Sequence, residues 1–388
     1  KKPSTPRSVS SSVSFTTARR GIEHSIYYGY NILAVPGVGG TLSTEEVRRH
    51  VADLERLVQE EYKPRHPPKR RDWRTYEQQL AHRIREVMHD LGPLVQEACA
   101  FSRARGPGPL PLLTLEQKVN LLLLKILYKQ SNRRMAFGLV AFSLLSGIEV
   151  SYKTVERLYS DPEVAVALTN LHTLMLRRRG VRVADTTGDG TGFTLSITQH
   201  YATTASKERE RAKENSIESE RGVGERKAHR FVYSFRLLDL RTWLYVAYGT
   251  SRKSEREAYA SALAWLKVQG IEVRSVRLDR YYSGPADTKQ FAGTAVYILP
   301  RKNSRVHFQR EWMRALRAFV EHPLEYLEAF YQREHSEAGF SADKRVLGWQ
   351  IAQRRGDRIE MADRGHSTWH NLLNLYGPDR AVPTGPLS

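Results

Sequence analysis

The 388 residues are too many for one minimal domain and predict two or three domains with a sizeable core. Lysine and arginine number 61 against 42 acidic residues, which gives a formal charge of +19 and a pI near 10.0. That excess favours a polyanionic partner, although a ribosomal or generally basic protein explains it too. The single cysteine, Cys99, excludes a disulfide framework and a cysteine-based zinc finger within one chain. No apolar run reaches the roughly 18 residues of a membrane span.

The first 111 residues predict an arm, two helices and a linker. Residues 1–40 are rich in Ser, Thr, Gly and Pro and predict a flexible basic arm; a transit peptide is the alternative reading of its start. The spacing of Ser43 and Glu46 forms a capping box, which opens a helix towards Tyr62. Residues 41–111 are therefore expected to form a helical region. Its second helix spans 73–102, and a Gly- and Pro-rich linker follows at 105–111.

Residues 112–180 predict a helix-turn-helix region that binds DNA. Its three helices are expected at 115–129, 133–146 and 151–159. Gly147 supplies the turn before the third helix, as in helix-turn-helix motifs. The exposed face of that helix would present Lys153 and Arg157 to DNA, whereas a helical bundle without DNA contacts is the alternative.

From residue 181 the pattern becomes strand-like and predicts an α/β catalytic domain over 181–350, followed by a C-terminal tail at 351–388. The expected elements are a strand at 181–197 broken around Gly188-Asp189-Gly190, a hairpin at 231–250, a helix at 253–269, strands at 271–279 and 294–300, and a helix at 310–337 interrupted by Pro323. This order is that of a ribonuclease H-like fold, a mixed sheet with helices on its faces.

One constellation near the C-terminal end carries chemistry. Phe330, Arg333, Glu337 and Lys344 follow the pattern aromatic-x2-Arg-x3-Glu-x6-Lys, which is expected to place the first three on one face of one helix. Glu334 and Glu328 compete for the acidic role, but only Glu337 has both the preceding arginine and the following lysine. A surface ion pair between Arg333 and Glu337 is the alternative interpretation.

With two upstream aspartates, this constellation resembles the DDE transposases of prokaryotic insertion sequences. The similarity is to the group with a Tyr-Arg-Glu-Lys signature, in which Phe330 takes the place of Tyr. Asp279 and Tyr282 match the Asp-x-x-Tyr-Ser stretch of that family. Asp189 begins a match to the Asp-(Gly/Ser)-Thr-Gly-aromatic stretch. Asp185 lies four residues before Asp189, so both side chains are expected on the same face of the strand. Asp185 is therefore either the alternative first metal ligand or a residue that supports the site.

The resemblance, over about residues 115–350, implies that Asp189, Asp279 and Glu337 are catalytic and hold two Mg²⁺ or Mn²⁺ ions. It implies that Arg333 and Lys344 contact DNA. The implied substrates are double-stranded terminal inverted repeats and target DNA, and 3′-hydroxyl ends are joined to the target. A homodimer or larger assembly in the cytoplasm, associated with the nucleoid, is also implied. Neither a membrane partner nor a nucleotide cofactor is expected.

Two rival functions and one rival site stay open. A nuclease of the same fold would cleave without joining, and a transposase-derived DNA-binding protein would not cleave at all. His366 and His370 have a zinc-like spacing, but no third ligand is evident, so a zinc site is not favoured.

Overall fold

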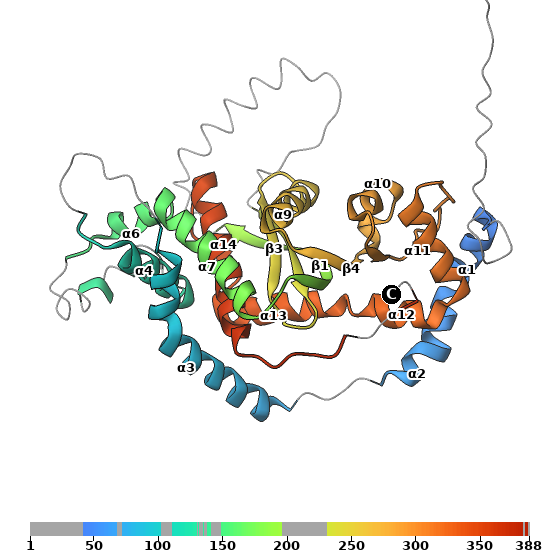
Figure 1. The fold of residues 1–388 in the computed structure, drawn as a ribbon, viewed down its shortest axis with the longest axis horizontal. Helices are drawn as coiled ribbons and strands as arrows, with labels where there is room; N and C mark the ends of the chain where they lie inside the picture. Colours follow the sequence, from blue (N-terminus) through green and yellow to red (C-terminus); the bar gives the residue numbers. More distant parts are fainter. Residues whose placement is uncertain are drawn as a thin grey trace, which may run out of the picture. The chain divides into compact units, whose positions relative to one another are not determined.

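The computed structural model describes residues 42–67, 72–101, 111–129, 131, 135, 138–140, 149–195, 231–382 and 385–386. These residues form a mixed β-sheet flanked by helices and preceded by a helical region (Figure 1). The expected α/β class is therefore confirmed. Across these ranges, no helix combines the length and the apolar character needed to cross a membrane.

The helices before residue 101 begin where their capping residues predict. The Ser43 side chain accepts a hydrogen bond of 3.1 Å from the backbone N–H of Glu46, at the start of α1. Asp72 caps the later helix in the same way. The helical segments are α1 (Thr44–Leu57), the π-helical turn η1 (Val58–Tyr62), α2 (Lys63–Arg65) and α3 (Trp73–Ala98). The helix expected from Ser43 to Tyr62 is thus confirmed, and α2 continues it.

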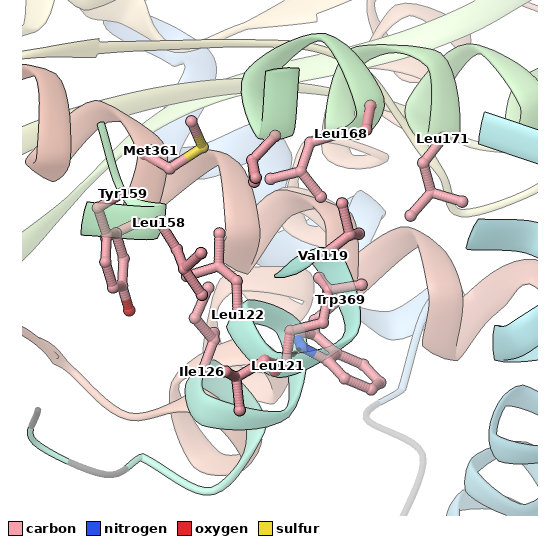
Figure 2. Close-up of a cluster of buried hydrophobic side chains, with 14 of the residues drawn as sticks. Val119, Leu121, Leu122, Ile126, Leu158, Tyr159, Leu168, Leu171, Met361 and Trp369 are labelled. Carbon is pink, nitrogen blue, oxygen red and sulfur yellow. Dashed lines mark hydrogen bonds between the residues drawn. The ribbon is translucent and has the colours of Figure 1, made fainter. Parts of the chain in front are cut away.

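A second set of helices shares a hydrophobic core, which Figure 2 shows in close-up. They are α4 (Leu115–Leu127), α6 (Tyr152–Leu158), α7 (Pro162–Arg178) and α14 (Gly356–Leu375). The Trp369 indole N–H of α14 donates to the backbone oxygen of Leu123 in α4 at 2.8 Å. α14 lies within residues 351–388, for which the sequence predicts only a C-terminal tail. The helix expected at 133–146 lies largely outside the described residues, so the helix-turn-helix stays a prediction.

The sheet has the strand order β3-β2-β1-β4-β5, and β6 pairs with β1. Its strands are β1 (Val183–Leu195), β2 (Phe231–Asp239), β3 (Tyr245–Ser251), β4 (Glu272–Leu278), β5 (Ala295–Tyr297) and β6 (Gln350–Ile351). Antiparallel pairing joins the first three strands, whereas β4 and β5 run parallel to β1. This topology is compatible with the expected ribonuclease H-like fold.

The first strand is continuous, so the break expected around Gly188-Asp189-Gly190 is wrong. Pairing with β2 runs without interruption from Thr186 to Thr194. The glycines make room for neighbouring side chains: a Cβ atom on Gly188 would lie only 2.7 Å from a methyl carbon of Leu237. The residues that look like a turn in the sequence therefore serve close packing within the sheet.

The remaining helices cover the sheet and carry the motif. They are α9 (Glu255–Gln269), η2 (Arg280–Tyr282), α10 (Pro285–Thr288), η3 (Lys289–Phe291), α11 (Arg310–Glu321), α12 (Pro323–Tyr331) and α13 (Glu334–Leu347). Phe330 belongs to α12 and is buried, whereas Arg333 immediately precedes α13. The expectation that Phe330, Arg333 and Glu337 share one helix is therefore wrong, because a turn at 332–333 separates α12 from α13.

A buried ionic network fastens α13 and α14 to the sheet. The fully buried Arg236 guanidinium on β2 donates to Asp343 of α13 at 2.9 Å and to Asp363 of α14 at 2.7 Å. The Tyr245 hydroxyl and a ring nitrogen of His370 also bond to Asp343, at 2.8 and 2.7 Å. Because each buried charge has partners from other elements, the network fixes the position of α13 on the sheet.

Candidate active site

Two of the expected catalytic aspartates lie side by side because of the register between β1 and β4. Gly188 pairs with Leu278 in this parallel pair, so the next residues along the two strands are Asp189 and Asp279. Asp279 directly follows β4 and precedes η2. Although 90 residues separate them in the sequence, the sheet brings these carboxylates to one place.

The start of α13 lies over the same part of the sheet. The Thr187 hydroxyl on β1 is 2.9 Å from the Ser336 hydroxyl on α13. Arg333 then joins the two elements, because its guanidinium donates to Asp189 at 2.7 Å and pairs with Glu337 at 2.8 Å. The ion pair between Arg333 and Glu337, which is the alternative interpretation of their spacing, is present. Because Arg333 also pairs with Asp189, the ion pair belongs to a larger cluster.

The charges of Asp279 and Glu337 both act on the carboxylate of Asp189. Burial, together with the negative charges of Asp279 and Glu337, raises the pKa of Asp189 to about 6, although the Arg333 guanidinium and the Gly190 N–H act in the opposite direction. Burial disfavours the charged form of Arg333, yet the three carboxylates together raise its pKa. The structure therefore brings Asp189, Asp279 and Glu337 together around one arginine.

The raised pKa of Asp189 predicts a pH-dependent stability. The folded state holds the Asp189 proton more tightly than the unfolded state, so this carboxyl destabilises the fold as pH rises from about 4 to about 6. Replacing Asp189 with Asn should thus stabilise the protein by about 1–3 kcal/mol more at pH 7 than at pH 4.5. Thermal melting of both proteins at the two pH values measures the difference.

Asp185 offers a control of opposite sign. Burial opposes its ionisation, but hydrogen bonds from Arg274 and Ser275 lower its pKa. Its stabilisation is present above the unfolded pKa and disappears as pH falls, so Asp185→Asn should be more harmful at pH 7 than at low pH. The same pH trend in both variants would contradict this assignment of charges.

The carboxylates suit a divalent cation by their chemistry. Asp189, Asp279 and Glu337 supply only oxygen donors, which Mg²⁺ and Mn²⁺ prefer. Among the described residues, however, no three Asp, Glu, His or Cys side chains are close enough to bind a common metal ion. Arg333 lies between Asp189 and Glu337 and neutralises both. The donor set fits a divalent ion, and binding would require Arg333 to give up these contacts.

The other expected helpers have separate positions. Asp185 is held by Arg274 and Ser275 rather than by Arg333. Tyr282 is buried, and its hydroxyl donates to Glu255 at 2.6 Å. Burial raises the pKa of Tyr282, and the negative charges of Glu255 and Asp189 raise it further. Tyr282 is therefore a neutral hydrogen-bond donor beside the acidic cluster.

Glu255 is a fourth carboxylate at this place, and the sequence motifs do not predict it. It is the first residue of α9, and a Cβ atom on Gly190 would lie 2.4 Å from its carboxyl carbon. The glycine next to Asp189 thus makes room for Glu255. No local motif marks this residue; the only signal in the sequence is an acidic residue after the Ser254 helix cap.

The expected DNA-contacting residues lie in two places. Lys344 lines a recess of about 450 Å³ together with Glu337, Arg345 and Trp349, so it shares this recess with one of the three carboxylates. Lys153 and Arg157 are exposed on α6. The two ring nitrogens of His370 bond to Asp343 and to the backbone oxygen of Trp243, which leaves neither for zinc.

Fold and site together define a basic α/β protein with a carboxylate cluster on two adjacent parallel strands. No family model and no solved structure matches the chain. It is 42% identical over 293 residues to a protein of Archaeoglobus fulgidus named "Probable transposase for insertion sequence element ISA1214". The aligned region covers 75% of this chain and 84% of that relative. The chain therefore belongs to the family of insertion-sequence transposases.

Proposed function

We propose that the protein is a DDE-type transposase whose Asp189, Asp279 and Glu337 hold two Mg²⁺ or Mn²⁺ ions. The observation that carries this proposal is the convergence of all three carboxylates on Arg333, from two strands and a helix. The ribonuclease H-like strand order and the membership of the insertion-sequence transposase family support it. When bound, such ions activate the attacking oxygen and stabilise the leaving oxygen of a phosphodiester.

The residues around the carboxylates would position DNA. The planar guanidinium of Arg333 suits phosphate oxygens, and in the DNA complex it would exchange Asp189 and Glu337 for a phosphate of the substrate. Lys344 faces the same recess as Glu337 and would contact the strand near the cleaved bond. In this scheme Asp189 is ionised when it binds the ions, and Tyr282 stays neutral.

The substrates are the terminal repeats of the element and its target DNA. Water would hydrolyse a phosphodiester at the element end and release a 3′-hydroxyl. That hydroxyl would then attack a phosphodiester of the target strand and displace the 3′-oxygen of the target. Two element ends must act together, so the active form would be a dimer or a larger assembly on DNA. The net charge of +19 supports binding to this polyanion.

Product analysis separates this function from its rivals. DNA ends taken from the sequence flanking the gene are incubated with the protein, target DNA and Mg²⁺ or Mn²⁺. A transposase yields cleaved ends with a 3′-hydroxyl and joined products. Cleavage without joining would indicate a nuclease, and binding without cleavage in either metal would indicate a DNA-binding protein that has lost catalysis.

The exposed cations of α6 predict a salt-dependent contact. If Lys153 and Arg157 each neutralise one phosphate, the double change to Ala should reduce the slope of log K against log salt by about 2. Titration of labelled terminal-repeat DNA at several salt concentrations measures that slope. Changing Arg48 and Arg49, which are exposed on α1, alters the charge equally and should leave the slope nearly unchanged. Equal effects of the two double variants would contradict a specific role for α6.

A further inference from the structure

A second cavity shares Trp349 with the recess that contains Glu337. It has a volume of about 330 Å³ and lies between α4, α14 and the segment around β6. Its polar and aromatic lining includes Lys125, Lys129, Tyr159, Trp349, Gln353 and His366. No carboxylate is among the described residues that line it, so the cavity is positively charged.

Lys125 gives the cavity a buried cation. Its side chain belongs to α4, is only 3% exposed, and donates to the Tyr159 hydroxyl at 2.7 Å. Burial lowers its pKa to about 8, so the ammonium still carries its charge at pH 7. Within the described part of the chain, no carboxylate forms an ion pair with Lys125. A buried ammonium with only a phenol partner favours an anionic ligand.

His366 supplies a buried polar atom that lacks a partner. The side chain is 5% exposed and lines the cavity, and its Nδ1 has no hydrogen-bond partner within the described residues. Burial lowers the pKa of His366 to about 4, so the ring is neutral at pH 7. A neutral imidazole offers one donor and one acceptor, which suits a ligand with polar edges. Buried polar atoms without a partner are uncommon in folded proteins.

Trp349 connects this cavity to the proposed active site. Its side chain is 71% exposed, yet it lines both the cavity and the recess that contains Glu337 and Lys344. Its backbone carbonyl accepts a hydrogen bond from the Thr194 N–H of β1 at 3.1 Å, which ties this segment to the sheet. An exposed indole is a stacking surface for an aromatic ring.

We propose that this cavity binds one unpaired nucleotide of the DNA strand held at the acidic cluster. The base stacks on Trp349 with its polar edge towards His366, and the phosphate lies towards Lys125 and Lys129. A nucleotide combines the features that the cavity selects: an anionic group, an aromatic face and polar edges. The site rests on the proposed function, because Trp349 joins the cavity to the recess that contains Glu337.

Two duplexes test this proposal in the absence of divalent metal. One is a blunt terminal-repeat end, and the other carries a single unpaired, 5′-phosphorylated nucleotide at that end. Wild-type protein should bind the second about 10-fold more tightly, as stacking of one base allows. Trp349→Ala should bring the ratio of affinities close to 1, whereas Trp349→Phe should keep most of it. Fluorescence anisotropy gives both dissociation constants.

Phe308→Ala is the matched control. Phe308 is 95% exposed but lies outside the cavity lining, so its loss should leave the ratio unchanged. Lys125→Met should remove the gain from the 5′-phosphate while preserving stacking. Equal wild-type affinities, or a ratio that survives Trp349→Ala, would overturn the proposal. If the protein cleaves DNA but does not prefer the duplex with the unpaired nucleotide, the nucleotide site alone is disproved. If it prefers that duplex but does not cleave, only the proposed function is disproved.

Discussion

Asp279→Asn and Glu337→Gln should each lower the rate of DNA end cleavage by about 10³-fold or more. Both amides keep the size of the side chain but remove the charge needed to hold a divalent cation. The proposed site needs all three carboxylates, so loss of either should remove most of the rate. Single-turnover cleavage of labelled terminal-repeat DNA measures the effect, and a gel-shift titration checks that binding is retained.

Glu334→Gln is the matched control for Glu337→Gln. Both glutamates are exposed in the first turn of α13, but only Glu337 pairs with Arg333. The control should cleave within about twofold of wild type, since surface changes away from the site have small effects. Loss of cleavage in Glu334→Gln together with normal cleavage in Glu337→Gln would contradict the assignment.

The same assay decides between Asp185 and Asp189. Asp189 interacts with Asp279 and Glu337, whereas Asp185 is engaged by Arg274 and Ser275. Asp189→Asn should therefore be as inactive as Asp279→Asn. Asp185→Asn should retain cleavage within about 10-fold of wild type. The reverse order would make Asp185 the first ligand.

The second large effect concerns stability. Arg236→Met should lower the free energy of unfolding by about 3–5 kcal/mol, because Asp343 and Asp363 would lose their buried partner. Thermal melting measures the loss, and Arg48→Met on the exposed face of α1 should have almost no effect. A loss of similar size in both variants would show that the network contributes little.

The pH dependence of this loss provides a second readout. Burial raises the pKa of Asp343, but His370, Arg236 and Tyr245 lower it below its usual value. Its stabilisation is therefore present above the unfolded pKa and is lost as pH falls. Without Arg236 the carboxylate protonates more readily, so the loss of stability should be smaller at pH 5 than at pH 7.

Local patterns predicted the features that local physics determines. The helix starting at Ser43, the β2–β3 hairpin and the strand that ends before Asp279 follow from caps, alternation and turns, and each is confirmed. The contact between Arg333 and Glu337 also follows from their spacing of four residues.

Features that depend on distant neighbours could not be predicted in this way. The glycines of β1 resemble a turn in the sequence, but Gly188 is needed because Leu237 of the neighbouring strand packs against it. Glu255 reaches the acidic cluster only because α9 packs on the sheet, and Arg333 contacts an aspartate 144 residues away in the sequence. The partners of Arg236 come from two helices more than 100 residues downstream. One sequence contains no local signal for such pairs.

We propose that Asp189, Asp279 and Glu337 form one site for divalent metal on DNA. The most direct test counts the Mn²⁺ bound by the protein on uncleaved terminal-repeat DNA, using the electron paramagnetic resonance signal of free Mn²⁺. We expect two ions per site in wild type and in Glu334→Gln, with at least one lost in Asp279→Asn and in Glu337→Gln. Equal Mn²⁺ binding by all four proteins would contradict the account.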